Sequence, residues 1–251
     1  MWTFFKSVFA GSDHVAQNMP CQDYADFTIT ENEIYVSALS DGASASAFGD
    51  IAAMCNVNAV LNSMHRVNFD SFYMADSSDK AHFLISACQE NIAQYFKRLR
   101  PADLKDFAAT LLMMVSDGKR MVLGHIGDGV ICAMDSHGNA VMLSSPNNVD
   151  LARDRTYFTV SKDAESVMNF MTVDDIDKYT AFILMSDGPE ASFYNYTLNQ
   201  LRSNNLLTIT NEIASERARE LELTYFLKSN FWKHGITGDD CSMVIFAKEL
   251  D

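Results

Sequence analysis

The sequence predicts an α+β fold in which antiparallel β-sheets pack on each other and helices lie outside them. Two long helix patterns stand next to each other in the first half of the chain, with strand and hairpin patterns on both sides. Strands and helices do not alternate as the βαβ units of a parallel sheet would require. No Gly/Ser/Pro-rich linker interrupts the 251 residues, so we expect a single domain spanning residues 1–251.

Strand patterns come first and helix patterns follow. The expected strands are Lys6 to Ala10, Tyr24 to Thr30 and Ile34 to Leu39, and the expected helices run from about Phe48 to Val67 and from Asp79 to Leu99. In the second helix the apolar residues recur at spacings of one, three and four, which is the pattern of one buried helix face. Asp79 is the candidate N-cap of that helix.

Hairpins are expected in the second half of the chain. Strands Phe107 to Val115 and Met121 to Ile126 flank Asp117-Gly118, a pair that tolerates the positive φ of a tight turn. Strands Val130 to Met134 and Ala140 to Leu143 flank a second polar turn. After an irregular polar stretch, the remaining expected elements are a strand at Ala181 to Met185, a helix from about Asn211 to Lys228 and a strand at Ser242 to Ala247.

Composition excludes several classes of protein. The formal charge of −14, from 19 Lys and Arg against 33 Asp and Glu, disfavours a nucleic-acid partner. Five widely spaced cysteines without a Cys-x-x-Cys pair predict reduced thiols. The chain has no signal-peptide pattern and no apolar run of the roughly 18 residues that a membrane span needs. We therefore expect a cytoplasmic protein without a membrane partner.

Four Asp-Gly pairs occur, and two of them follow buried strands. Asp117-Gly118 is explained by its turn. Asp41 and Asp187 each close an apolar strand within Ser-Asp-Gly, and neither is followed by an obvious return strand. A carboxylate at the tip of a buried strand is held rigidly, and glycine lets the backbone approach a ligand closely. The local pattern alone leaves both a ligand and a turn open.

Further aspartates stand where strands begin. Asp23 precedes the second strand, and the adjacent Asp239 and Asp240 precede the last one. Neighbouring carboxylates repel each other and usually lie in solvated loops, but a bound cation removes the repulsion. Hard cations such as Mg²⁺ and Mn²⁺ prefer oxygen ligands of this kind.

Six motifs in order carry a more specific signal. They are Gln22-Asp23, Ser40-Asp41-Gly42, Phe107-Ala108-Ala109-Thr110, Ile126-Gly127-Asp128-Gly129, Met185-Ser186-Asp187-Gly188 and Asp239-Asp240-Cys241-Ser242. Each is weak by itself, but together, from about residue 7 to 248, the series resembles the metal-dependent protein phosphatases of type 2C, and most of all a compact bacterial subgroup. The resemblance implies a central antiparallel β-sandwich flanked by helix pairs, in α-β-β-α layers.

The resemblance also implies a role for each matching residue. Asp41 is expected to bridge two Mn²⁺ or Mg²⁺ ions, which makes it the central ligand. The other expected ligands are the Gly42 carbonyl, Asp187 and Asp239 at the first ion, Asp23 through bound waters, and Asp128 together with Asp187 at a third ion found in some members. Thr110 matches a small hydroxyl position behind the site, for which a structural role is favoured.

The implied activity is that of a serine/threonine protein phosphatase. A metal-activated water would hydrolyse phosphoserine or phosphothreonine on a phosphorylated protein substrate, opposing a Ser/Thr kinase. The catalytic set is then Asp23, Asp41, Asp187 and Asp239. Nothing in the sequence specifies the oligomeric state.

Three departures from the family pattern bear on activity. Asn18 stands where many members have a phosphate-binding arginine, Ser44 replaces a glycine, and Ala43 replaces a histidine of the animal enzymes. A guanidinium binds phosphate more strongly than an amide does. We therefore expect a weaker grip on substrate, or a substitute cation such as Lys6 or Arg153.

Two alternative functions stay open. The missing arginine motivates an inactive, partner-binding relative, and the acidic set also suits a small-molecule phosphoesterase. Two residue assignments are likewise open: His125 either touches the site or, as favoured, packs behind it, and Phe193 to Tyr196 either shape a substrate rim or, as favoured, pack beneath a loop.

Overall fold

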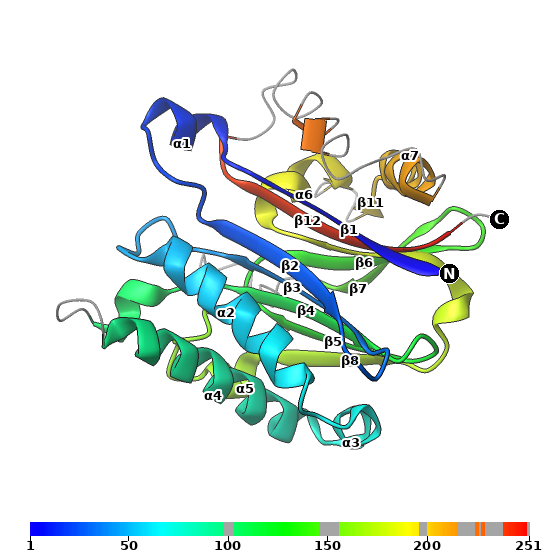
Figure 1. Cartoon of the computed structure of the whole chain (residues 1–251). Helices are drawn as coiled ribbons and strands as arrows, with labels where there is room; N and C mark the ends of the chain where they lie inside the picture. The colour runs from blue at the N-terminus through cyan, green and yellow to red at the C-terminus, as the bar shows by residue number, and fades with distance from the viewer. Residues whose placement is uncertain are drawn as a thin grey trace.

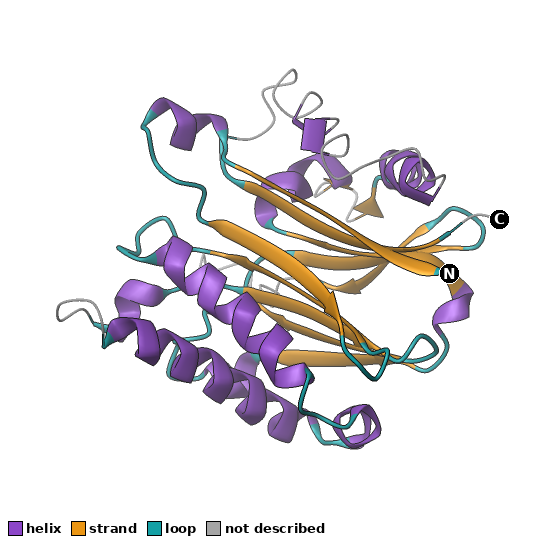
Figure 2. Cartoon of the chain, in the orientation of Figure 1, coloured by secondary structure: helices purple, strands orange, loops and turns teal. Residues whose placement is uncertain are grey.

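Two antiparallel sheets of five strands each pack face to face at the centre of the folded protein (Figure 1). The computed structural model describes residues 1–97, 103–145, 156–195, 200–214, 224–225, 227–228 and 238–249. Helices cover the outer face of both sheets, as Figure 2 shows. The predicted α-β-β-α sandwich is confirmed.

The first sheet joins the two ends of the chain. Its strands, in spatial order, are β1 (Trp2–Phe9), β12 (Cys241–Lys248), β9 (Tyr179–Met185), β6 (Val130–Asp135) and β7 (Ala140–Ser144). β12, β9 and β6 are central, and nearly all their residues are buried. Such continuously apolar strands are expected when both faces of a sheet are covered.

In the second sheet, the spatial order of the strands follows their order in the sequence. Its order is β2 (Asp23–Ile29), β3 (Tyr35–Asp41), β4 (Leu111–Ser116), β5 (Met121–Ile126) and β8 (Asn169–Val173). The turn between β4 and β5 contains Gly118 at φ 80°, and the turn between β6 and β7 contains Gly138 at φ 81°. Both predicted hairpins are therefore confirmed.

The two long helices lie on the outer face of the second sheet, and two shorter ones lie on the outer face of the first (Figure 1). The long pair is α2 (Gly49–Met64) and α4 (Ser77–Phe96), and the other pair is α6 (Asp187–Phe193) and α7 (Ser203–Ala214). The smaller elements are α1 (Ser12–Ala16), α3 (Phe69–Met74), α5 (Ala164–Val167), η1 (Leu104–Phe107), η2 (Ile176–Lys178), β10 (Tyr194–Asn195) and β11 (Gln200–Leu201). Within the described ranges, no helix is both long and apolar enough to cross a membrane.

Several boundaries differ from the sequence prediction. Helix α4 begins at Ser77 after Asp76, so Asp79 lies in the first turn and the prediction that it caps the helix was wrong. Helix α7 begins at Ser203, earlier than the expected Asn211, and most of the expected stretch to Lys228 lies outside the described residues, as does the expected end of α4 at Leu99. Strand β8 was not expected, because an edge strand with one neighbour and exposed side chains lacks a continuous apolar pattern.

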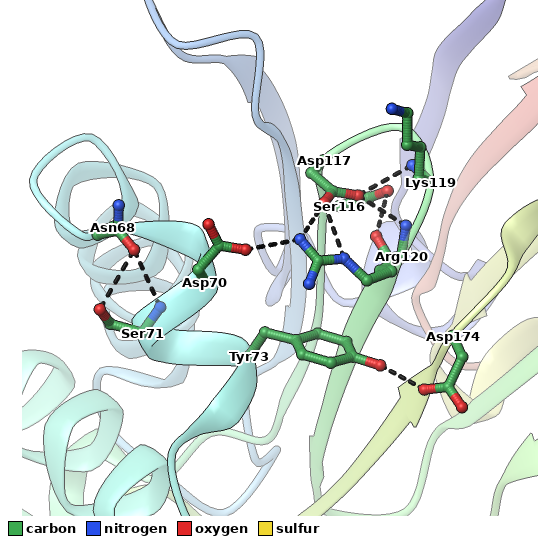
Figure 3. A network of polar contacts seen from close by, with 9 residues as sticks. All are labelled: Asn68, Asp70, Ser71, Tyr73, Ser116, Asp117, Lys119, Arg120 and Asp174. Atoms are coloured by element: carbon green, nitrogen blue, oxygen red, sulfur yellow. Dashed lines mark hydrogen bonds and ion pairs between the residues drawn. The ribbon is translucent and has the colours of Figure 1, made fainter.

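A polar cluster holds α3 against the turn between β4 and β5 (Figure 3). Arg120 Nη2 lies 2.7 Å from both Asp70 Oδ1 and Asp117 Oδ2, and its guanidinium lies over the ring of Tyr73, 4.9 Å from the ring centroid. The Tyr73 hydroxyl donates a hydrogen bond to Asp174 (Figure 3). Asp117 thus has a structural role at one end of the sandwich, as its turn position predicted.

Aromatic rings fill the space between the sheets. Phe246 on β12 is fully buried, and its ring centroid lies 4.5 Å from that of Phe4 and 4.8 Å from that of Trp2. We predict that Phe246→Ala lowers the free energy of unfolding by about 3–5 kcal/mol, because removal of the buried ring leaves a large cavity between the sheets. Urea unfolding measures this. The control is Met74→Ala, at a side chain that is 76% exposed; an equal loss in both variants would contradict the packing.

Candidate metal centre

Two of the expected ligands are direct neighbours in the second sheet. Asp23 is the first residue of β2, Asp41 is the last residue of β3, and the two are register partners. Side chains of directly opposed residues lie on the same face, with Cβ atoms about 5 Å apart. Strand pairing alone therefore brings these two carboxyl groups together.

Three further carboxylates come from the same end of the first sheet. Met185 on β9 pairs with Val130 on β6 and with Met243 on β12. Asp187 follows Met185, while Asp128 and Asp239 precede the other two strands. Because the paired strands are antiparallel, the end of β9 lies beside the starts of β6 and β12. The three acids therefore lie at the same end of the sheet.

Glycines let the segments that carry these acids touch. A Cβ on Gly188 would lie 1.9 Å from the Asp240 carbonyl oxygen, and one on Gly129 would lie 2.6 Å from the Met185 carbonyl oxygen. A Cβ on Gly42 would lie 2.4 Å from the carbonyl of Gly49 at the start of α2. None of these contacts leaves room for a side chain. Close packing therefore requires glycine after each of these aspartates, whether or not a turn also favours it.

The charge around Asp41 shows that the five acids converge. Burial raises the pKa of Asp41 well above its usual range, and the carboxylates of Asp23, Asp187, Asp128 and Asp239 raise it further. Like charges within a few ångströms disfavour ionisation of the group between them. The structure therefore brings all five predicted acids within electrostatic range of one centre.

The pKa values of two other acids in this group are raised as well. Burial raises the pKa of Asp23 to about 7, although a hydrogen bond of 2.8 Å from Ser186 Oγ to Asp23 Oδ2 opposes the shift. Burial raises the pKa of Asp187 to about 6, with the charges of Asp128 and Asp239 adding to it.

The residues fit a site for divalent cations. Oδ1 of Asp23 and Oδ1 of Asp187 are buried and accept no hydrogen bond from any described residue. A buried carboxylate oxygen without a donor costs free energy that a cation would offset. In the part of the chain that is described, no three His, Cys, Asp or Glu side chains already stand close enough to surround one ion. The two oxygens without a donor and the convergence of the acids on Asp41 are the features that suit this centre to cations.

Hydroxyl groups hold the ends of the acid-bearing strands. Thr110 Oγ1 accepts a hydrogen bond of 2.9 Å from the Asp41 amide, which agrees with the structural role expected of it. Thr156 Oγ1 donates to Asp128 Oδ2 at 2.6 Å. Thr156 was not among the residues singled out from the sequence, and Ser186 was quoted only as part of a motif without a role of its own, because a single hydroxyl residue carries no distinctive pattern.

Two other candidate residues, His125 and Phe193, are buried. His125 is buried on β5, its Nδ1 lies 2.7 Å from Ser144 Oγ, and burial lowers its pKa to about 4. Phe193 is 3% exposed within the core beneath α6, so packing accounts for it, while Tyr196 lies outside the described residues.

The position of the missing arginine has a local explanation. Asn18 is exposed just after α1 and has φ 54°, a left-handed conformation that asparagine adopts more readily than most residues. Lys6, one expected substitute, forms an ion pair of 2.7 Å with Asp26. Arg153, the other, lies outside the described residues.

An antiparallel sandwich with outer helices and an acidic centre at one end of both sheets defines a narrow class of α+β proteins. The chain belongs to the protein phosphatase 2C family, whose model matches residues 10–228. No curated protein sequence matches the chain closely enough to count as a relative.

Solved structures agree with the family assignment. The serine/threonine phosphatase of S. agalactiae has a TM-score of 0.72 at 13% identity, covering 99% of this chain and 100% of that one. Stp1 from Staphylococcus aureus has a TM-score of 0.69 at 11% identity, covering 100% and 96%. The catalytic domain of PstP in complex with two manganese ions has a TM-score of 0.66 at 15% identity, covering 100% and 99%. At such low identity, these likenesses establish the fold.

The raised pKa values predict how stability depends on pH. A carboxyl group whose pKa is higher in the folded chain than in the unfolded chain stabilises the fold at low pH. That contribution is lost as pH rises through the folded pKa, here about 6 for Asp187 and about 7 for Asp23. Metal-free protein should therefore lose on the order of 1 kcal/mol or more between pH 5 and pH 8.

Thermal unfolding in EDTA across this pH range measures the loss. Asp128→Asn should make it smaller, because the charge of Asp128 is one of those that raise the pKa of Asp187. A wild-type midpoint that stays constant from pH 5 to pH 8, or a variant that behaves like wild type, would contradict the clustering of charge.

Proposed function

We propose that this protein is a metal-dependent serine/threonine protein phosphatase, built as a single domain. The observation that carries the proposal is the convergence of Asp23, Asp128, Asp187 and Asp239 on the half-buried Asp41. Membership of the protein phosphatase 2C family supports the reaction class. A cytoplasmic location and a role in bacterial signalling belong to the same proposal.

The acids would have two kinds of role: one would bind two metal ions at once, and the others would complete the coordination of each ion. Asp41 would bridge two Mn²⁺ or Mg²⁺ ions, because it lies among the other four carboxylates. Asp187, Asp239, Asp23 and the Gly42 carbonyl would complete the shells, and Asp128 with Asp187 would hold a third ion. The PstP structure, which holds two manganese ions, supports the pair of ions proposed at Asp41. Bound cations would supply the Lewis acidity that activates water and offsets phosphoryl charge.

The chain's own groups would keep the acids oriented. Ser186 directs one oxygen of Asp23 and leaves Oδ1 without a donor. Thr156 directs Oδ2 of Asp128, and Thr110 holds the backbone of Asp41. Because Asp23 is buried and Asp41 and Asp187 are half-buried, attraction between these carboxylates and a cation would be stronger there than in bulk solvent.

The substrate would be a phosphorylated protein, presented by the action of a Ser/Thr kinase. Asn18 is exposed, and Lys6 is already paired with Asp26. Neither therefore offers the free guanidinium fork that grips phosphate in many members. We expect the cations to provide most of the phosphate binding, with a correspondingly high KM.

A phosphothreonine peptide assay tests the proposal. Wild-type protein with Mn²⁺ should release phosphate, and both EDTA and Asp187→Asn should lower kcat/KM about 100-fold or more, since transition-state charge loses its counter-charge. Asp117→Asn is the matched control, because Asp117 also precedes glycine but lies in the β4–β5 turn. It should keep wild-type activity.

Three other outcomes would each reject the proposal in a different way. Full activity in EDTA would remove the metal mechanism. Hydrolysis of an aryl phosphate without any phosphopeptide would favour a small-molecule phosphoesterase. A folded, inactive protein with every metal tested would favour a partner-binding role.

A further inference from the structure

Asp240 follows the proposed ligand Asp239 in sequence but is engaged in a different way. Its side chain is 2% exposed, and Oδ1 accepts a hydrogen bond of 2.8 Å from the Gly11 amide. Oδ2 accepts one of 2.5 Å from the Gln22 amide and lies 2.8 Å from His14 Nδ1. Both oxygens already have partners, so Asp240 is poorly suited to coordinate an ion.

The segment around α1 is docked on the loop that carries Asp239. The Asp13 amide donates a hydrogen bond of 3.0 Å to the Gly238 carbonyl. A Cβ on Gly11 would lie 2.2 Å from the backbone carbonyl of Asp239, and a Cβ on Gly238 would lie 2.2 Å from Asp13 Oδ2. The backbone on both sides of Asp239 is therefore held by direct contact with residues 11–14.

Asp240 also reaches the segment that leads into Asp23, because Gln22 immediately precedes it. The Gln22 carbonyl in turn accepts a hydrogen bond of 3.1 Å from the amide of Gly42, next to Asp41. One buried carboxylate thus connects the backbone beside Asp239 with the backbone beside Asp23 and, through Gln22, with that beside Asp41.

We propose that Asp240 and His14 are positioning residues of the metal centre. Asp240 fixes Asp239 relative to Asp23 through the amides of Gly11 and Gln22, and His14 holds the Asp240 carboxylate in the orientation that reaches both amides. This inference rests on the proposed function, because it assigns Asp239 and Asp23 to the same pair of ions.

His14 is itself buried, at 7% exposed, and comes from α1, so its position depends on the same docked segment. A carboxyl group buried in a low-dielectric environment depends on its polar partners for stabilisation. A third polar partner from the side lowers the cost of that burial and restrains rotation of the carboxyl group. Residues that orient metal ligands in this way commonly change metal affinity about 10- to 100-fold when they are mutated.

The test measures Mn²⁺ binding by calorimetry on the whole chain, so that hydrolysis is not needed as a readout. In Asp240→Asn the side-chain NH₂ group would face one of the two amide donors, and the Mn²⁺ dissociation constant should rise about 10-fold or more. His14→Leu should also raise it. His14→Gln, which keeps a polar group beside Asp240, should restore most of the affinity, whereas a role in packing alone would not distinguish Leu from Gln in this manner.

Asp135→Asn is the matched control, because the Asp135 carboxylate also accepts hydrogen bonds from two backbone amides, those of His137 and Asn139, but in the β6–β7 turn. Its Mn²⁺ affinity should equal that of wild type. Hydrogen exchange at the Gly11 and Gln22 amides gives a second readout: both should be protected in wild type and lose protection in Asp240→Asn. If Asp240→Asn does not fold, the two His14 variants supply the same comparison.

The possible failures can be told apart. Wild-type protein that binds no Mn²⁺ would overturn the proposed function and this inference with it. Wild-type protein that binds Mn²⁺, with Asp240→Asn and both His14 variants binding it equally well, would overturn the positioning role alone. Unchanged protection of the Gly11 and Gln22 amides in Asp240→Asn would do so too.

Discussion

Repulsion among buried carboxylates is the constraint that the rest of this structure has to satisfy. Asp41 is surrounded by the charges of four other aspartates, and burial and these charges together raise its pKa well above its usual range. Such a cluster opposes folding when no cation is present. The free energy that holds it together comes from elsewhere, mainly from the apolar surface buried between two five-stranded sheets and beneath the helices.

The fold holds the acids by placing them where the backbone is least free to move. Strand register determines the separation of Asp23 and Asp41, and glycine contacts press the loop of Asp187 against that of Asp240. Hydroxyl donors such as Ser186 and Thr156 then orient individual oxygens. These are short, directional contacts made by rigid elements, which is what a preorganised ion site requires.

The sequence predicted the parts of this arrangement that have a local signature. Apolar strands, Asp-Gly turns and the amphipathic pattern of α4 identified most of the sandwich, and the order of the aspartates identified the acids that meet at Asp41. Strand β8 and helix α3 were missed because a polar edge strand and a helix of less than two turns show little periodicity. The link from His14 to Asp240 joins residues at opposite ends of the chain, so only tertiary structure reveals it. The metal-binding roles themselves stay predictions.

The most direct measurement of the central claim is a crystal structure with Mn²⁺, using anomalous scattering to locate the ions. We predict two strong peaks, both within coordination distance of Asp41, one of them also within coordination distance of Asp187 and Asp239. Crystals grown at saturating Mn²⁺ that show no peak beside Asp41, or peaks only at surface acids such as Asp103, would contradict it.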